Sequence, residues 1–507
     1  MIASHQVAFF LRELGSTDPA RRAAAVKGLG RVPGHADRLA ALAGDPAPQV
    51  RAAAALGLGR QGGAAPVEPL LMLCSDPDAE VRRRAVNALD RLGASGPAVV
   101  EAFARRLGDT ALRNRLVVLD RLRRLEAPVP AGALMPLLST ADTDPGLWAS
   151  AASLLRLLPE ADAVLADLVR TGPAEVRRRA LDMLAAPQAG VPGMRADAGP
   201  EEQEAAWHRL WNPEPRVVEA LLAALEAETD AYARSRLFNA LAAHHAPEAV
   251  APAAAWLADP ECGPSAAAAL AAAGTVEAVE LLREAATRRR RRGSEPHSAV
   301  IRALGAAGDV TDAALLLDLL DDRSASVRLA AVGGLGAFFQ RFDGSLHGRL
   351  ERWRAERVPG LPVPPPDDDP AVRDLARRAA EQLTRMLVHD AEQADTYHNA
   401  LWHIPEVRPL LRPLLRAPDG RVRSTALHLA ERFGELDFAD RLRALNDPDG
   451  AVRQGAALSF LQLVQRGELT PDERDTLRTR LQRRQDDPDH YVRSWTAQAL
   501  EHLDRAA

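Results

Sequence analysis

A short pattern returns along this chain about every thirty residues, and it constrains the fold more than any other feature. It consists of an Asp, often followed by Pro, then a Val-Arg pair, and then Ala and Leu at helical spacing. Residues 76–89 hold one clear copy, and residues 447–457 hold another. Self-similarity at a period of about 20–50 residues indicates stacked structural units rather than one globular core.

Each copy of the pattern predicts a helix. An Asp before a helix can accept hydrogen bonds from its free N–H groups, and Pro is tolerated in the first turn. Val81, Ala85 and Leu89 then form one apolar stripe at positions i, i+4 and i+8. Shorter helices are expected between the marked ones, for example over residues 67–73. Each unit is therefore a helical hairpin, which buries its apolar face by stacking on its neighbours.

An Asp precedes an Arg by six positions in eight of these units. The pairs are Asp45/Arg51, Asp76/Arg82, Asp109/Arg115, Asp230/Arg236, Asp322/Arg328, Asp367/Arg373, Asp447/Arg453 and Asp487/Arg493. The pattern resembles HEAT repeats, and it is close to the bacterial HEAT-like variety that phycobilin lyases share. This resemblance implies that the Asp and Arg residues form a ladder between adjacent repeats. It also implies that the second helices line a concave surface.

The resemblance covers nearly the whole chain and implies an all-α fold, a right-handed α-α superhelical solenoid of stacked HEAT-like hairpins. Division of the length by the repeat period gives roughly 14–16 repeats. No alternating strand pattern of useful length appears in the sequence.

Two segments interrupt the period and suggest domain boundaries. Residues 187–204 are rich in Gly, Pro and Ala, and residues 357–370 are rich in Pro and Asp, so both are expected to be loops. We therefore expect an N-terminal repeat block over 1–186, central degenerate repeats over 205–356, and a C-terminal repeat block over 371–507.

The composition excludes several classes of protein. The 507 residues include 64 basic and 69 acidic side chains, and this balance argues against a surface built wholly for nucleic acid. Two cysteines, Cys74 and Cys262, exclude a disulfide framework and a Cys-rich zinc site. No apolar run reaches the roughly 18 residues of a transmembrane helix. Residues 1–14 lack the features of a signal peptide, so a cytoplasmic location is expected.

The sequence contains no recognisable catalytic motif. Residues 57–62 read G-x-G-x-x-G, but they follow an Ala-rich helix instead of a strand, and Gly-Leu-Gly recurs at 28–30 and 334–336 as a helix ending. The only lysine, Lys27, follows Val26, which excludes a Walker A loop. None of the 13 histidines precedes Glu, unlike the iron-binding His-Glu pairs of the HEAT-like enzyme deoxyhypusine hydroxylase. We expect neither an enzyme nor a cofactor.

One segment concentrates potential metal ligands. It contains His389, Asp390, Glu392, Asp395, His398 and His403. On a single helix His389 and His398 would lie on opposite faces, because nine residues advance the helical wheel by about half a turn. A metal site would require the chain to turn between them, so an ordinary polar helix junction is favoured and no metal is expected.

Two kinds of surface residue are candidates for contact with a partner. Arg288, Arg289, Arg290, Arg291 and Arg292 form an anion contact or a basic helix end. Residues that point away from the apolar stripes of the second helices form the other set. They are Arg83, Asn87, Asp90, Arg178, Asp182, Thr425, His428, Arg432, Trp495 and Gln498. Trp495 is expected either to anchor a partner or to cover the open end of the solenoid.

Pervasive repeats without a catalytic constellation predict a non-enzymatic scaffold or adaptor. It would bind a protein or an extended peptide along the concave surface, because the outward residues vary in charge from repeat to repeat. A nucleic-acid-binding or HEAT-like DNA-repair protein that uses Arg-rich concave residues is the first alternative. A lyase-type modification enzyme, which needs a local pocket that breaks the repeat, is the second.

Overall fold

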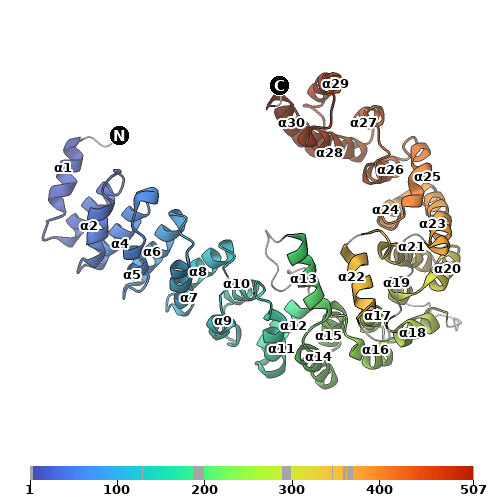
Figure 1. Ribbon diagram of the computed structural model, residues 1–507, viewed down its shortest axis with the longest axis horizontal. Helices are drawn as coiled ribbons and strands as arrows, with labels where there is room; N and C mark the ends of the chain where they lie inside the picture. The colour runs from blue at the N-terminus through green and yellow to red at the C-terminus, as the bar shows by residue number, and fades with distance from the viewer. Residues whose placement is uncertain are drawn as a thin grey trace. The chain divides into compact units, whose positions relative to one another are not determined.

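The computed structural model of this protein describes residues 4–127, 129–185, 199–287, 298–344, 346–357, 361 and 369–505 (Figure 1). Over these ranges the secondary structure consists of the α-helices α1 to α30 and short 3-10 helices, with no strand. The predicted all-α class is confirmed. None of these helices combines the length and the apolar character that a membrane crossing requires.

The chain divides into two compact units, and the boundary in the sequence lies between His244 and His245. Unit 1 contains α1 (Ser4–Glu13), α2 (Pro19–Leu29), α3 (Ala36–Ala41), α4 (Pro48–Leu58), α5 (Glu68–Leu73), α6 (Ala79–Arg91), α7 (Pro97–Arg105), α8 (Leu112–Arg124), α9 (Ala131–Leu138), α10 (Pro145–Leu155), α11 (Ala161–Thr171), α12 (Ala174–Leu184), α13 (Pro200–Trp211), α14 (Pro215–Ala227) and α15 (Ala231–Ala243).

Unit 2 contains the remaining helices. They are α16 (Val250–Trp256), α17 (Gly263–Ala273), α18 (Val276–Thr287), α19 (Ser298–Ala307), α20 (Val310–Leu319), α21 (Ala325–Gln340), α22 (Leu346–Ala355), α23 (Pro370–His389), α24 (Ala394–Leu401), α25 (Arg408–Leu414), α26 (Gly420–Arg432), α27 (Phe438–Ala444), α28 (Gly450–Arg466), α29 (Pro471–Gln482) and α30 (His490–Arg505).

Consecutive helices pack as pairs, and the second helix of one pair packs on the second helix of the next, as α2, α4, α6 and α8 do. Seven pairs can be followed in each unit over the described residues, so their total falls at the low end of the predicted range of repeats. The structure thus agrees with the predicted solenoid of helical hairpins. Helices α13 and α22 stand outside this pairing.

The predicted boundaries have mixed outcomes. Residues 187–198 and most of 357–370 lie outside the described residues. Residues 200–204, predicted as the end of a loop, form the first turns of α13. The three-block division stays a prediction, and the boundary between the two units falls within the predicted central block.

Helix starts depend on a different Asp from the one that the sequence pattern indicated. Asp76 was expected to cap its helix, but Asp78 accepts the hydrogen bonds from the amides of Glu80 and Val81 at the start of α6. Asp76 instead accepts a bond from the amide of Asp78 and closes the preceding turn. Asp449 caps α28 in the same way. The second Asp of the Asp-Pro-Asp sequence is therefore the helix cap.

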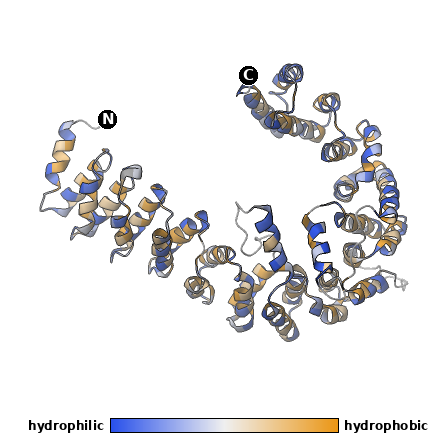
Figure 2. Ribbon diagram, in the orientation of Figure 1, coloured by the Kyte–Doolittle hydropathy of each residue, from blue (hydrophilic) through white to orange (hydrophobic). Residues whose placement is uncertain are grey.

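The apolar stripes form the core. Val81, Ala85 and Leu89 are each fully buried, as predicted. Hydrophobic and hydrophilic residues alternate around individual helices, as amphipathic packing requires (Figure 2).

Glycines have two separate roles in the packing. Gly93 and Gly434 follow helix ends and adopt the left-handed conformation that glycine allows there. Residues 334–336, however, lie inside α21, so their interpretation as a helix ending is wrong. A Cβ atom on Gly305 would lie 2.1 Å from the carbonyl oxygen of Gly334, which shows that this glycine lets α19 and α21 approach closely.

Candidate binding surfaces on the second helices

Ion pairs between successive second helices fix the register of the regular repeats. Arg82 on α6 donates two hydrogen bonds to the carboxylate of Asp109, from Nε at 2.6 Å and from Nη2 at 2.8 Å. Its Nη1 donates to the carbonyl oxygens of Asp76 and Pro77 in the turn before its own helix. One guanidinium therefore joins its own turn to the turn of the next repeat.

Five such contacts make up what we call the Arg–Asp ladder. They are Arg22–Asp45, Arg51–Asp76 and Arg82–Asp109 in unit 1, and Arg423–Asp447 and Arg453–Asp487 in unit 2. The ladder implied by the family resemblance is confirmed at these positions.

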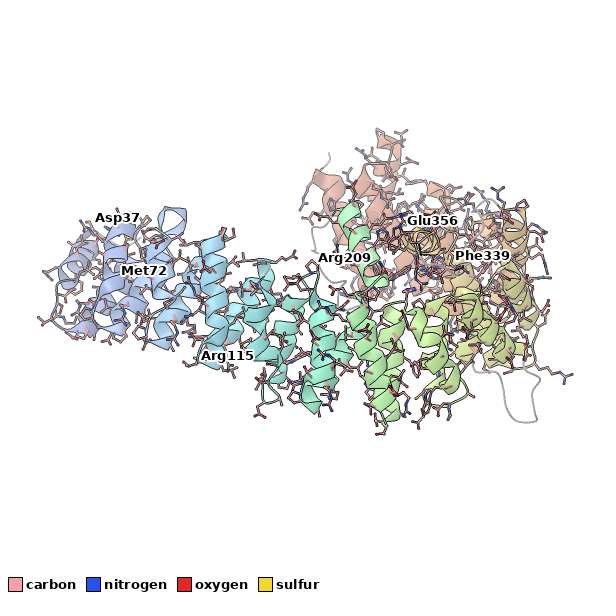
Figure 3. The ribbon with its side chains drawn as sticks, turned by 60° about the horizontal axis from the view of Figure 1, so that its bottom comes forward. Asp37, Met72, Arg115, Arg209, Phe339 and Glu356 are labelled. Carbon is pink, nitrogen blue, oxygen red and sulfur yellow. The ribbon has the colours of Figure 1, made fainter. Side chains whose placement is uncertain are left out.

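The ladder is broken at other predicted positions. Arg115 lies on α8 (Figure 3). Among the described residues, its Nε atom is buried without a hydrogen-bond partner. Arg236 binds Asp182 of α12 at 3.0 Å. Within the described ranges, Arg493 of the last repeat is found to donate to the carbonyl oxygens of Asp487 and Pro488 in its own turn. Asp367 lies outside the described residues.

Hydrogen bonds keep the ladder carboxylates ionised. Burial raises the pKa of Asp109, but hydrogen bonds from Arg82, the Ala111 amide and Asn114 outweigh it and lower the pKa to about 2. The hydrogen bond to Asp109 raises the pKa of Arg82. Both members of the pair are thus charged at neutral pH.

Three predicted partner-binding residues lie together in a groove on unit 1, which we call the α6–α8 groove. Its volume is about 310 Å³. It is lined by Leu56, Gly59, Arg83, Arg84, Asn87, Ala88, Asp90, Arg91 and Arg121. Arg83 is paired with Glu80 at 2.6 Å, and Asp90 with Arg121 at 3.2 Å.

Arg178 and Asp182 line a second and larger cavity of about 550 Å³, which we call the α12–α15 pocket. Its lining residues come from four helices and from the turn between α14 and α15: Val169, Arg170, Ala174, Arg177, Arg178, Leu181, Asp182, Ala220, Ala223, Ala224, Ala227, Glu228, Asp230, Tyr232, Ala233, Arg236 and Leu237. Arg178 contacts both Glu175 and Asp182, while Asp182 also accepts from Arg236. Polar groups therefore surround part of the opening.

The sequence analysis missed the apolar part of this pocket. Ala220, Ala223, Ala224 and Ala227 form one face of α14 at helical spacing, and Tyr232 is 67% exposed. The spacing of these alanines in the sequence indicates a small-residue face on one helix. It does not indicate which other helices face the alanines across the pocket.

The candidates in unit 2 are more scattered. Thr425 was expected to point outward, but it is only 5% exposed, because α26 packs on both α24 and α28. His428 and Arg432 are exposed, and the Arg432 guanidinium lies 5.3 Å from the ring centre of Trp402. The prediction that Thr425 points outward is therefore wrong, because neighbouring helices bury it.

The last helix carries the two remaining candidates. Trp495 is half-buried and packs against the core, with its ring centre 5.6 Å from that of exposed Tyr491. Gln498 is exposed on the same helix. This placement is compatible with either predicted role of Trp495.

The remaining candidates do not form a metal centre in the part of the chain that is described. The chain turns after His389, where α23 ends, and α24 begins at Ala394. Even with this turn, no group of three or more His, Cys, Asp or Glu side chains in the described ranges is placed to hold a metal ion. Arg288 to Arg292 lie outside those ranges.

Comparison with known proteins identifies the repeat. The family model described as HEAT repeats matches residues 7–78 and again residues 35–123. Residues 7–123 therefore contain HEAT repeats, as the sequence pattern indicated. No curated protein sequence matches it.

Comparison with solved structures finds only distant similarities. An engineered protein is 20% identical, with 98% of this chain and 99% of that chain covered and a TM-score of 0.23. Importin beta is 12% identical, with 98% and 77% covered and a TM-score of 0.36. The karyopherin Kap121p bound to the SUMO protease Ulp1p is 11% identical, with 99% and 70% covered and a TM-score of 0.39. Likenesses this distant carry no argument about what the present chain binds.

Proposed function

We propose that this protein is a non-enzymatic adaptor that binds an extended segment of a protein partner, with the α12–α15 pocket as the principal contact. The observation that carries the proposal is the combination of an alanine-lined cavity with the exposed ring of Tyr232. Exposed aromatic side chains beside a pocket are typical of the few residues that dominate protein interfaces.

The chemistry of the pocket suits a polypeptide. Alanine side chains end at Cβ, so the face of α14 leaves room for an apolar side chain of the partner. Arg178 and Arg236 offer hydrogen-bond donors at the opening, and Asp182 offers acceptors. A backbone with alternating N–H and C=O groups can use both kinds, whereas a polyanion would be repelled by Asp182.

The two alternatives receive less support from this site. The pocket breaks the repeat, as a lyase-type enzyme would need, but the three carboxylates in its lining already have structural partners. Asp182 accepts hydrogen bonds from Arg178 and Arg236. Glu228 accepts from the amides of Thr229 and Asp230, and Asp230 accepts from the amide of Ala233. Nucleic-acid binding is disfavoured because the pocket arginines Arg178 and Arg236 are already paired with carboxylates.

Site-specific photo-crosslinking in the full chain tests the proposal. A photoreactive amino acid at position 223 lies in the pocket, while position 226, on the same helix, lies outside its lining. We expect one protein to be crosslinked from position 223 but not from 226, and to bind the purified chain directly.

A pair of variants then tests whether the pocket itself is occupied. Ala223→Trp fills the cavity and should weaken binding of that protein at least tenfold, while Glu226→Trp should leave it unchanged. Equal effects of the two variants, or equal crosslinking from the two positions, would contradict the proposal.

A further inference from the structure

Three arginines stand at equivalent places in three consecutive repeats of unit 1. Arg31 and Arg60 follow the ends of α2 and α4, and Arg91 is the last residue of α6. All three are exposed, and we call them the arginine strip. They lie roughly one repeat apart in the sequence, so each second helix contributes one guanidinium.

Glycines bring these helix ends unusually close together. A Cβ atom on Gly30 would lie 2.6 Å from the Cα of Gly57, and one on Gly59 would lie 2.9 Å from the Cα of Ala88. Side chains essentially never approach a backbone this closely, so glycine is required at both contacts. The Gly-Leu-Gly-Arg sequences at 28–31 and 57–60 therefore combine a close helix contact with an arginine immediately after it.

The strip concentrates positive charge without neutralising it. No ion pair is found for Arg31, Arg60 or Arg91 within the described residues, in contrast to the neighbouring Arg83 and Arg84, which share Glu80. Burial and then the charges of Arg31, Arg91 and Arg84 lower the pKa of Arg60. Mutual repulsion among exposed arginines is relieved when an anion binds between them.

We propose that the arginine strip binds successive carboxylates of an acidic segment of the partner protein. This inference rests on the proposed adaptor function and adds the charge of the bound polypeptide. Arg91 also lines the α6–α8 groove, together with Asn87, whose side-chain amide can bond a peptide backbone.

An acidic peptide fits the surroundings of the strip better than nucleic acid does. Asp90 is partly exposed next to Arg91, and its carboxylate would repel the continuous phosphates of a duplex. A peptide can place carboxylates at the arginines and a neutral residue at Asp90.

Fluorescence anisotropy with the full chain tests this inference. The probes are a fluorescein-labelled oligoglutamate peptide, the matching oligoglutamine peptide and a labelled DNA duplex. We expect the wild-type chain to bind oligoglutamate most tightly. Replacement of Arg31, Arg60 and Arg91 together by Gln should weaken that binding by about tenfold, because each exposed charge pair contributes modestly.

A matched triple variant controls for net charge. Arg12→Gln, Arg38→Gln and Arg105→Gln remove three exposed arginines of first helices in the same unit, and oligoglutamate binding should be unchanged. Equal melting temperatures of the two triple variants would show that neither has lost its fold.

Several results would overturn the inference. They are no oligoglutamate binding by the wild type, equal binding of oligoglutamine, equal losses in the two triple variants, and tighter binding of the duplex. The two proposals can fail separately. If only the adaptor proposal is wrong, no protein will be crosslinked from position 223, but oligoglutamate will still bind the arginine strip.

Discussion

Two runs of helices within unit 1 are built from the same kind of pair but are held together differently. In the regular run, α2 to α8, the Arg–Asp ladder joins each repeat to the next and the groove is narrow and polar. In the irregular run, α11 to α15, Arg236 reaches back to Asp182 and a larger, alanine-lined pocket opens. The pocket thus lies where the ladder is absent.

Helix α13 distinguishes the irregular run. It stands in the sequence between the pairs α11–α12 and α14–α15, and α12 still packs on α15. A different buried cluster lies at the end of α13: His244 contacts the carbonyl oxygen of Leu210 at 3.3 Å, and Asp162 pairs with Arg156. In the regular run, the Arg–Asp ladder holds successive repeats in register. In the irregular run, the helices leave the α12–α15 pocket between them.

The largest expected effect tests the helical phase of the regular run. Leu89→Asp places a charge in a fully buried position and should lower the free energy of unfolding by about 4 kcal/mol or more. Arg83→Asp changes a partly exposed side chain and should cost much less. Thermal unfolding of both variants checks this, and equal melting temperatures would contradict the assigned phase.

The next prediction compares the two kinds of ion pair. Arg82→Met leaves the buried carboxylate of Asp109 without a counter-charge, although the Ala111 amide and Asn114 still donate to it, and should cost about 3 kcal/mol. Arg236→Met breaks a more exposed pair and should cost less than about 1 kcal/mol. Denaturant unfolding measures both, and adding Asp109→Asn to Arg82→Met should recover part of the loss. No recovery would show that the Arg82 stem, rather than its charge, is responsible.

Acid should loosen the irregular run before the regular one. Burial lowers the pKa of His244, and the contacts of Asp109 lower its pKa to about 2, so the unfolded state binds more protons in both cases. The stability that each contributes is complete above its unfolded pKa and is lost as the pH falls toward its folded pKa. The loss therefore begins below about pH 6.5 for His244 and below about pH 3.9 for Asp109.

Hydrogen exchange resolved by peptide measures this order. Exchange in α11, α13 and α15 should rise between about pH 7 and about pH 5, after correction for the intrinsic rate, while α6 and α8 stay protected. His244→Gln should remove that dependence. A simultaneous rise in both runs would contradict the separation.

The smallest effects concern two glycines. Gly59→Ala forces apart the ends of α4 and α6 and should cost about 1 kcal/mol. Gly132→Ala in α9 meets open space and should stabilise the chain by up to about 1 kcal/mol. The melting temperature should fall for Gly59→Ala and rise for Gly132→Ala. Shifts in the same direction would contradict the close contact of Gly59 with Ala88.

Local features were predictable from the sequence, and features that depend on neighbouring repeats were only partly so. The stripe of Val81, Ala85 and Leu89 follows from helical spacing alone, and the ladder followed from family resemblance. The cap at Asp78 was missed because Asp76 and Asp78 are both suitable acceptors, and the contact with Arg51 occupies Asp76. Spacing alone cannot reveal such a competition.

The candidate site shows the same division. Arg178 and Asp182 were selected as outward residues of one helix, and both line the pocket. Tyr232 and the alanine face of α14 were missed because their juxtaposition depends on how the chain resumes after α13. Thr425 was placed outward because its own helix was considered without the neighbours that cover it.

Hydrogen exchange of the full chain with and without the protein crosslinked at position 223 tests the central claim most directly. The claim is that the partner occupies the interruption in the repeats. We predict that binding slows exchange most strongly in α12, in α14 and at the start of α15 around Tyr232. Protection confined to unit 2, or spread evenly over all second helices, would contradict it.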